Sequence, residues 1–351
     1  MLVTSLFIFL ISFVVSLVAI PNIIAVANEK FLFDKPTEKR KIHTRSTPNL
    51  GGVAIFLGFY FSILTFRVLC DSVELSALCA ASVLLFFLAL KDDLISTPPK
   101  TRLFYQFLIA LIIILIGQIY FTNIPFFSAE NTISLIANMF VSLIFIVALI
   151  NAFNFIDGID GLAGTIAFFA LTIFAFFFYQ YGETSYSHIA LALAGSTLGF
   201  LIFNFHPAKI FMGDIGSMLL GVFLAVFAIK LSNLGQLQVG LIPVKDPICI
   251  AFSLLIIPIM DLITVVIIRL KLRLSPFNAD KRHTHHRLLA LGLSHMGVTL
   301  VLLAFNMLAV VVAYLTGSLN PWISLLILSA MGAAFELILL AVYIKKVGIK
   351  K

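Results

Sequence analysis

The chain alternates between long apolar runs and short polar segments over nearly its whole length. A helix needs about 20 mostly apolar residues to cross the hydrocarbon core of a bilayer. Runs of this kind lie roughly at residues 2–27, 50–68, 73–90, 103–122, 133–150, 162–181, 186–203, 213–231, 247–268, 296–317 and 321–344. The pattern therefore predicts an all-α polytopic membrane protein with about 11 transmembrane helices, in which residues 1–351 form a single integral membrane domain.

Composition supports this interpretation. Of 351 residues, 61% are apolar and 11% are charged, and the mean hydropathy is +1.13. The first run has neither a basic start nor a clear cleavage site of small residues, so we interpret it as the first span and not as a signal peptide. The three cysteines show no metal-ligand spacing, which argues against a disulfide framework or a cysteine zinc site.

Lysine and arginine indicate the orientation, because they accumulate in cytoplasmic loops. With the N-terminus outside and the C-terminus in the cytoplasm, the cytoplasmic segments hold 20 of the 23 basic residues. These segments are residues 28–49, 91–102, 204–212 and 269–296 and the tail after residue 344. The net charge of +7 therefore reflects topology and contact with membrane lipids or phosphate, and no nucleic-acid partner is expected.

In this orientation every segment rich in potentially catalytic residues faces the cytoplasm. Ionisable groups at membrane depth are functional candidates by default. Five segments qualify: KIHTRSTPNLGG (41–52), KDDLISTPPKTR (91–102), NAFNFIDGIDGLAG (151–164), NFHPAKIFMGDIGS (204–217) and SPFNADKRHTHHRL (275–288). The sequence thus predicts an active site at the cytoplasmic face.

Carboxylates recur at the ends of the apolar runs. Asp92 and Asp93 end the third run, Asp157 and Asp160 share a helix face if their segment is helical, and Asp214 begins the eighth run. Neighbouring carboxylates repel unless a cation holds them or one keeps its proton. Solvated acids, or an N-cap role for Asp214, are the simpler alternatives. The recurrence favours a site for metal and phosphate.

A basic loop near residue 283 carries three histidines. His283, His285 and His286 follow Arg282. Zinc is one interpretation, but no cysteine or glutamate stands at ligand spacing and H-E-x-x-H is absent. Imidazoles beside arginine also suit a diphosphate, which we favour.

These residues describe a membrane enzyme that acts on a phosphorylated, metal-bound substrate. The chain has neither a P-loop nor a dinucleotide-binding glycine motif. A transporter or flippase of a lipid-linked or anionic substrate is the alternative, and it would place its charges near mid-span beside broken helices.

The five motifs, in this order, resemble the polyprenyl-phosphate N-acetylhexosamine-1-phosphate transferase family. The resemblance covers nearly the whole chain. It implies transfer of a sugar 1-phosphate from a UDP-sugar to undecaprenyl phosphate, with Mg²⁺ (or Mn²⁺) and release of UMP, at a bacterial inner membrane. The H-T-H-H spelling of the histidine motif is similar to the WecA and TagO branch, so UDP-GlcNAc is the expected donor. A homodimer is left open.

The resemblance also implies a role for each matching residue. Asp92 and Asp93 match the catalytic aspartate pair, in which Asp92 removes a proton from the lipid phosphate, and Asp214 and Asp157 match metal ligands. The expected substrate-binding residues are Lys100, Asn154, Asp157, Asp160, Phe211, Arg282, His283, His285 and His286, of which Lys100 matches a phosphate-binding residue and Phe211 a position that stacks on uracil.

Overall fold

The computed structural model describes residues 2–32, 47–69, 72–95, 97–124, 127–128, 131–237, 241–273 and 282–347. Parts of three predicted motifs, residues 41–46, residue 96 and residues 275–281, lie outside these ranges, as does the basic tail 348–351.

The described chain is helical apart from short loops and one small hairpin. The helices are α1 (Leu2–Glu29), α2 (Gly51–Thr65), α3 (Val73–Leu94), α4 (Pro99–Leu115), α5 (Thr132–Ile156), α6 (Leu162–Gln180), α7 (Thr184–Asn204), α8 (Gly213–Asn233), α9 (Pro247–Leu254), α10 (Ile256–Lys271), α11 (Thr284–Ala290), α12 (His295–Thr316) and α13 (Pro321–Val347). Strands β1 (Asn123–Ile124) and β2 (Phe127–Ser128) pair antiparallel. All eleven predicted runs contain helix, which confirms the all-α polytopic class.

Eight of the described helices are long and apolar enough to cross a membrane. The ninth predicted run is divided into α9 and α10, which meet at a bend of 67° and add one further span if they cross together. Helix α2 has 15 residues and α4 has 17, fewer than a perpendicular span requires. The count of 11 spans stays a prediction.

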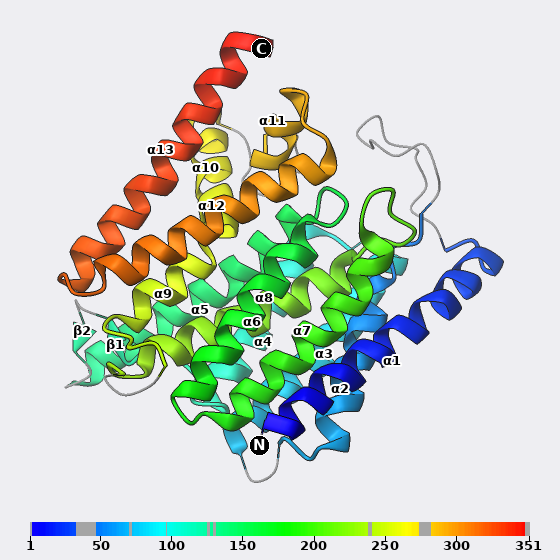
Figure 1. Cartoon of the computed structure of the whole chain (residues 1–351), viewed down its shortest axis with the longest axis horizontal. Coiled ribbons are helices and arrows are strands. Elements are labelled where there is room, and N and C mark those ends of the chain that lie inside the picture. The colour runs from blue at the N-terminus through cyan, green and yellow to red at the C-terminus, as the bar shows by residue number, and fades with distance from the viewer. Residues whose placement is uncertain are drawn as a thin grey trace.

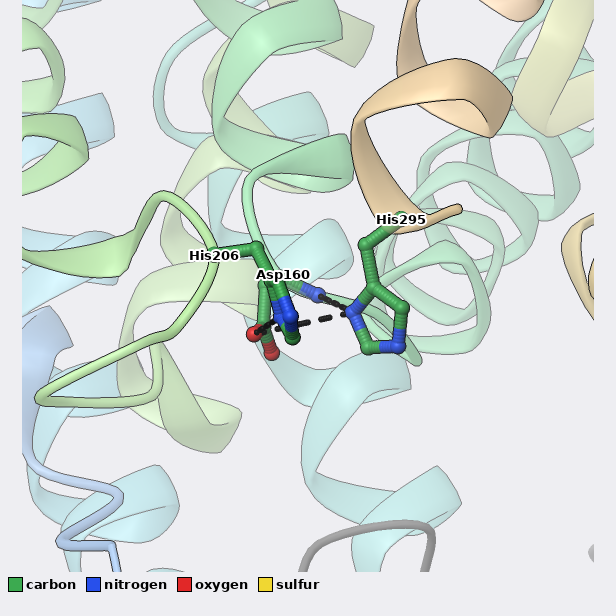
Figure 2. Close-up of side chains that lie close together, drawn as sticks. All are labelled: Asp160, His206 and His295. Atoms are coloured by element: carbon green, nitrogen blue, oxygen red, sulfur yellow. Dashed lines mark hydrogen bonds and ion pairs between the residues drawn. The ribbon is translucent and has the colours of Figure 1, made fainter. Parts of the chain in front are cut away.

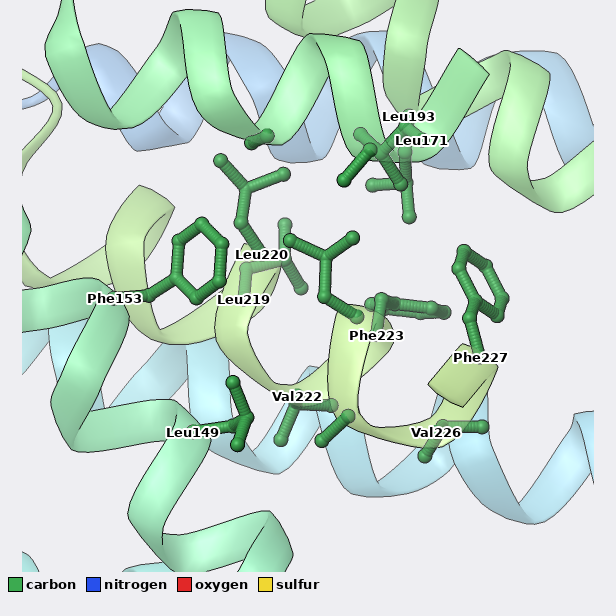
Figure 3. Close-up of a cluster of buried hydrophobic side chains, with 14 of the residues drawn as sticks. Leu149, Phe153, Leu171, Leu193, Leu219, Leu220, Val222, Phe223, Val226 and Phe227 are labelled. Carbon is green, nitrogen blue, oxygen red and sulfur yellow. The ribbon is translucent and has the colours of Figure 1, made fainter. Parts of the chain in front are cut away.

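Helix α8 is the centre of the bundle. In its most apolar stretch 89% of the residues are buried, because apolar side chains surround the helix and do not form a single stripe. Figure 3 shows α8 residues Phe223 and Phe227 facing Leu171 of α6 and Leu193 of α7, while Leu149 and Phe153 of α5 cover another side. The helix therefore has little freedom to shift, and its first turn is a rigid platform.

The predicted motifs gather at one end of this bundle. In Figure 1 the starts of α1 and α7 lie at the bottom, whereas α11, the end of α13 and the loop between α7 and α8 lie in the upper half. The start of α1 and the end of α13 therefore lie at opposite ends of the bundle, which fits an odd number of membrane crossings.

Two of the helix boundaries that differ from the predicted runs affect the predicted site. Helix α5 continues to Ile156, and Asp157–Gly161 then form a turn. The conditional expectation that Asp157 and Asp160 share a helix face therefore does not apply. Helix α4 begins at Pro99, since proline suits the first helical position, so Lys100 and Arg102 stand in its first turn.

Candidate active site

The start of α2 and the segment before α8 are joined backbone to backbone. The N–H groups of Gly51 and Gly52 donate to the carbonyls of Phe211 and Met212, at 2.9 and 2.8 Å. A Cβ on Gly52 would lie 2.1 Å from the backbone nitrogen of Gly216, so only glycine allows this approach. The end of the first motif thus fixes the position of Phe211 and the start of α8.

Asp93 holds the first turn of α8. Its two carboxylate oxygens accept the backbone N–H groups of Asp214 and Ile215, at 2.8 and 3.1 Å. Such N–H groups have no partner within their own helix, and a carboxylate also suits the positive end of the helix dipole. The N-cap residue Met212 provides no side-chain bond. Asp93 of α3 therefore does the capping, which leaves the Asp214 side chain for another task.

The Asp214 carboxylate is held by neutral donors and one cation. Asn154 donates through Nδ2 to Asp214 Oδ1 at 2.5 Å and to Ser217 Oγ at 3.1 Å. Arg102 Nη1 lies 3.5 Å from Asp214 Oδ2. The carboxylate is thereby oriented between α4, α5 and α8 and is still partly exposed.

Arg102 connects Asp214 with Asp92. Its Nε lies 2.7 Å from Asp92 Oδ2, while Asp92 Oδ1 accepts the backbone N–H and the hydroxyl of Thr97, each at 2.8 Å. Asp92 is buried, and Lys100 in the same turn as Arg102 is exposed. The two adjacent aspartates are thus tolerated because Asp92 has a guanidinium partner and Asp93 has backbone donors.

Asp157 lies in a different electrostatic situation. Among the described residues its carboxylate has no hydrogen bond or ion pair, although the chain places it near three other acids. Burial, and then the charges of Asp214, Asp93 and Asp160, raise the pKa of the Asp157 carboxyl well above its usual range. An acid destabilised by burial and like charges favours either a proton or a bound cation.

This donor set fits a magnesium ion. Mg²⁺ takes hard oxygen ligands, and proteins commonly hold it with one or two carboxylates together with phosphate oxygens of the substrate. Asp157 and Asp214 offer two such carboxylates, and Arg102 is the cation beside Asp214. The pair could therefore hold Mg²⁺ and leave coordination positions for phosphate.

Asp160 belongs to a separate cluster at the edge of this site. Its Oδ2 accepts from Nδ1 of His206 at 2.7 Å and from the backbone N–H of Ala208 at 3.1 Å, and it lies 3.6 Å from Nδ1 of His295. Figure 2 shows the carboxylate beside the two rings, whose centres are 4.6 Å apart. The sequence pattern singled out neither His206 nor His295 as a site residue.

The histidine motif is anchored to two late helices by buried acids. Asp261 of α10 accepts from Nδ1 of His283 and from the backbone N–H of Thr284, both at 2.7 Å. Glu336 of α13 accepts from the Thr284 hydroxyl at 2.5 Å and from the Arg287 guanidinium. A carboxylate inside a membrane span needs a polar partner. For Asp261 and Glu336 these partners all belong to the histidine motif.

His285 connects α11 to the turn that follows α5. Its side chain is buried, and a Cβ on Gly158 would lie 2.2 Å from its Nε2. Burial, followed by the charge of His286, lowers the pKa of His285 to about 3. His285 is therefore neutral at physiological pH, while Arg282 and His286 are the partly exposed members of the motif.

The structure brings most of the predicted residues together. Asp92, Asp93, Asn154 and Asp214 form one bonded network, and Asp157 interacts with it electrostatically. Sequence reasoning missed several supporting residues: Thr97, His206, Ser217 and His295. Each hydroxyl lies within five positions of a predicted aspartate, which was the available signal, whereas the two histidines carry no local one.

Comparison with known proteins identifies the family of this chain. Residues 75–232 match the protein family described as glycosyl transferase family 4. A probable undecaprenyl-phosphate N-acetylglucosaminyl 1-phosphate transferase of Bacillus subtilis is 33% identical over 91% of this chain and 87% of its own length. A decaprenyl-phosphate N-acetylglucosaminephosphotransferase of Mycobacterium tuberculosis is 31% identical over 75% of this chain and 70% of its own.

A third relative has a similar name. The undecaprenyl-phosphate alpha-N-acetylglucosaminyl 1-phosphate transferase of Escherichia coli is 29% identical over 81% of this chain and 76% of its own length. The matched region includes α3, α5 and the start of α8, which supply Asp92, Asp93, Asp157 and Asp214. The chain therefore belongs to glycosyl transferase family 4, among the polyprenyl-phosphate N-acetylhexosamine-1-phosphate transferases that its five motifs resemble.

Proposed function

We propose that this protein transfers N-acetylglucosamine 1-phosphate from UDP-GlcNAc to undecaprenyl phosphate, releases UMP and so initiates a cell-envelope glycan. One observation carries the proposal. Carboxylates from the ends of three apolar helices, Asp92 and Asp93 of α3, Asp157 after α5 and Asp214 of α8, interact in one cluster, in which Arg102 pairs with Asp92 and with Asp214. The names of the relatives supply the transferred group and the acceptor, and the family resemblance supplies the UDP-linked donor.

The reaction is a displacement at phosphorus. An oxygen of the lipid phosphate attacks the β-phosphorus of the donor, and the bond from this phosphorus to the bridging oxygen breaks. UMP leaves with that oxygen on the side opposite to the attack. The second pKa of a phosphate monoester is about 6, so most of the lipid phosphate is a dianion at pH 7 and its attack needs no net proton transfer.

Each aspartate has a separate role in this reaction. Asp214 and Asp157 hold Mg²⁺, which when bound spreads the charge of the diphosphate. Asp93 fixes Asp214 by capping α8. Asp92, which is paired with Arg102, accepts the proton from the fraction of lipid phosphate that is still protonated.

The donor is held by groups around this network. Lys100, Arg282 and His286 are among the exposed or partly exposed basic side chains of the five motifs, and we assign the diphosphate to them. Phe211, fixed by its backbone bond to Gly51, supports the uracil. His283 holds the start of α11 to α10, His285 contacts the turn after α5, and Asn154 and Asp160 complete the donor site.

A reconstitution with purified components tests the proposal. The protein is incubated in nanodiscs with Mg²⁺, undecaprenyl phosphate and a panel of UDP-sugars, and lipid-linked product and UMP are measured. UDP-GlcNAc should give equal amounts of both. Movement of a lipid-linked sugar between leaflets without UMP release would instead identify a flippase, and product from another UDP-sugar alone would correct the donor.

A further inference from the structure

A side-chain cluster beside the proposed donor site has the composition of a metal centre. Asp160 comes from the turn after α5, His206 from the loop between α7 and α8, and His295 from the first residue of α12 (Figure 2). Oδ2 of Asp160 and one nitrogen from each ring lie within 4.8 Å of one another. In the part of the chain that the structure describes, no other group of three such residues is this close.

We propose that Asp160, His206 and His295 bind a first-row transition-metal ion such as Zn²⁺, in addition to the Mg²⁺ of the carboxylate site. Two imidazoles and one carboxylate suit Zn²⁺, Co²⁺ or Ni²⁺, whereas Mg²⁺ prefers oxygen alone. Three protein ligands leave the fourth position of a tetrahedral ion open.

The existing contacts need little rearrangement to accept such an ion. Oδ2 of Asp160 lies 2.7 Å from Nδ1 of His206 and 3.6 Å from Nδ1 of His295. Ligand atoms about 2 Å from a tetrahedral zinc ion are separated by a little over 3 Å, which falls between these two values. The His206 side chain is 51% exposed, so an ion can enter from solvent.

The protonation change can be stated for each ligand. A carboxylate only accepts, so Nδ1 of His206 carries the hydrogen of its bond to Asp160. When a metal takes this nitrogen, the neutral ring carries its hydrogen on Nε2 instead. Nδ1 of His295 accepts the backbone N–H of Asp160 at 3.4 Å, so it carries no hydrogen, and a metal would replace this long hydrogen bond. No oxidation or reduction is involved.

The functional consequence rests on the proposed function, in which Asp160 helps to bind the donor. An ion bound to Oδ2 occupies that carboxylate and links the α7–α8 loop to α12. The transition metal therefore competes with UDP-GlcNAc and inhibits the transferase without displacing Mg²⁺ from Asp157 and Asp214.

Direct binding tests the site independently of activity. Full-length protein in nanodiscs with excess Mg²⁺ is titrated with Co²⁺, followed by its visible absorption, and with Zn²⁺ by calorimetry. We expect one equivalent to bind, and His206→Gln and His295→Gln should each weaken the affinity about tenfold or more. His188→Gln is the matched control, because His188 is half-buried and bonds to Ser5 on α1 near the other end of the bundle.

A fourth variant separates this cluster from the histidine motif. Loss of binding in His286→Gln with wild-type affinity in His206→Gln and His295→Gln would overturn the assignment. So would the absence of any binding above the affinity of nonspecific surface sites.

The kinetic experiment tests the competition. Zn²⁺ should raise the KM for UDP-GlcNAc in the wild type with kcat recovered at saturating donor, and the ratio of KM with and without Zn²⁺ should be smaller in His206→Gln. Binding at the cluster with an unchanged donor KM would refute the competition. A protein that binds the metal but transfers no sugar would refute the proposed function while leaving the metal site established.

Discussion

At the scale of single residues, the acids of the site differ chiefly in the groups that their carboxylates bond to. Asp92 and Asp93 have their oxygens occupied by Arg102, Thr97 and backbone donors of α8. Asp157, by contrast, has no hydrogen bond from the described residues, and burial together with the charges of three other acids raises its pKa. A sequence shows four similar aspartates, and it cannot show this division of roles because every partner except Thr97 comes from another helix.

The metal assignment is tested by Asp214→Asn. The amide has nearly the same volume, so the fold should be kept, but a neutral ligand binds Mg²⁺ weakly. Loss of one such electrostatic contact typically lowers turnover by about 10²–10³-fold, and we expect a loss of this order together with a higher Mg²⁺ requirement. Steady-state kinetics over a Mg²⁺ titration measure both quantities.

Asp246→Asn is the control for that measurement. Asp246 is also a buried acid, but it accepts from Cys249 Sγ beside the start of α9, away from the site. The Asp246→Asn variant should leave the Mg²⁺ dependence of turnover unchanged. Near-normal turnover in a folded Asp214→Asn protein would remove Asp214 from the site.

Protonation of His285 should limit stability in acid. Its pKa of about 3 in the folded state lies below the unfolded value of about 6.5. As pH falls from 6.5 toward 3, the unfolded chain binds a proton that the folded chain does not, so the free energy of unfolding decreases by up to about 1.4 kcal/mol per pH unit. His285→Gln removes this contribution.

Thermal unfolding at pH 7.5 and at pH 4.5 provides the comparison. The decrease in Tm between the two pH values should be smaller in His285→Gln than in the wild type. Equal decreases in the two proteins would mean that His285 titrates normally in the folded state.

At the scale of elements, the sequence predicted the existence of the helices better than their ends. Apolar length predicts a span because the bilayer imposes it, and all eleven runs contain helix. The end of α5 and the start of α4 were missed because polar residues of the site continue the helix beyond the apolar run. The bend between α9 and α10 was also missed. Residues 247–268 were predicted as one span from their apolar length, although Pro258 lacks the N–H that a continuous helix would use at that position.

The position of α11 could not be predicted from local sequence. Its anchors are Asp261 and Glu336, which are 22 and 52 residues away from their partners His283 and Thr284. The sequence showed only that each buried acid needs a partner. Choosing among partners requires the packing of α10 and α13 on either side of α11.

This anchoring predicts the effect of Glu336→Gln. Arg287 is buried, and removing one member of a buried ion pair costs about 3–5 kcal/mol because the other charge is left uncompensated. We expect a lower Tm and a higher KM for UDP-GlcNAc with a smaller change in kcat, because α11 would hold the donor less firmly. Calorimetry and donor kinetics measure these effects.

Two further variants identify the cause. Glu336→Gln combined with Arg287→Gln removes both charges, so it should regain stability relative to the single variant without regaining donor affinity. Glu74→Gln removes the charge of another paired acid, at the start of α3, which interacts with Lys230 and Tyr186. This variant should leave the donor KM unchanged. A raised KM in Glu74→Gln of the same size would make the effect one of general stability.

At the scale of the whole molecule, a rigid centre carries a polar end. Helix α8 is buried along its length, and its first turn receives Asp93 from α3, Asn154 from α5 and the backbone of the segment before α2. The start of α8 therefore positions four motifs that are far apart in the sequence. The order of the motifs in the sequence indicated a shared side of the membrane, and only the packing shows that they share one site.

The orientation of this polar end is the last prediction. Nucleotide sugars are cytoplasmic, so the end that carries α11 must face the cytoplasm if the proposed function is correct, and the basic residues of the loops predict the same orientation. The turn between α6 and α7 lies at the opposite end (Figure 1), and a Cβ on Gly182 in that turn would have no heavy atom within 4 Å, so a reporter should be tolerated there. A reporter inserted after Gly182 should be external and one fused after Lys351 cytoplasmic, as read from paired alkaline phosphatase and fluorescent-protein fusions. The reverse pair of results would turn every site residue away from the donor and would overturn the active-site assignment together with the orientation.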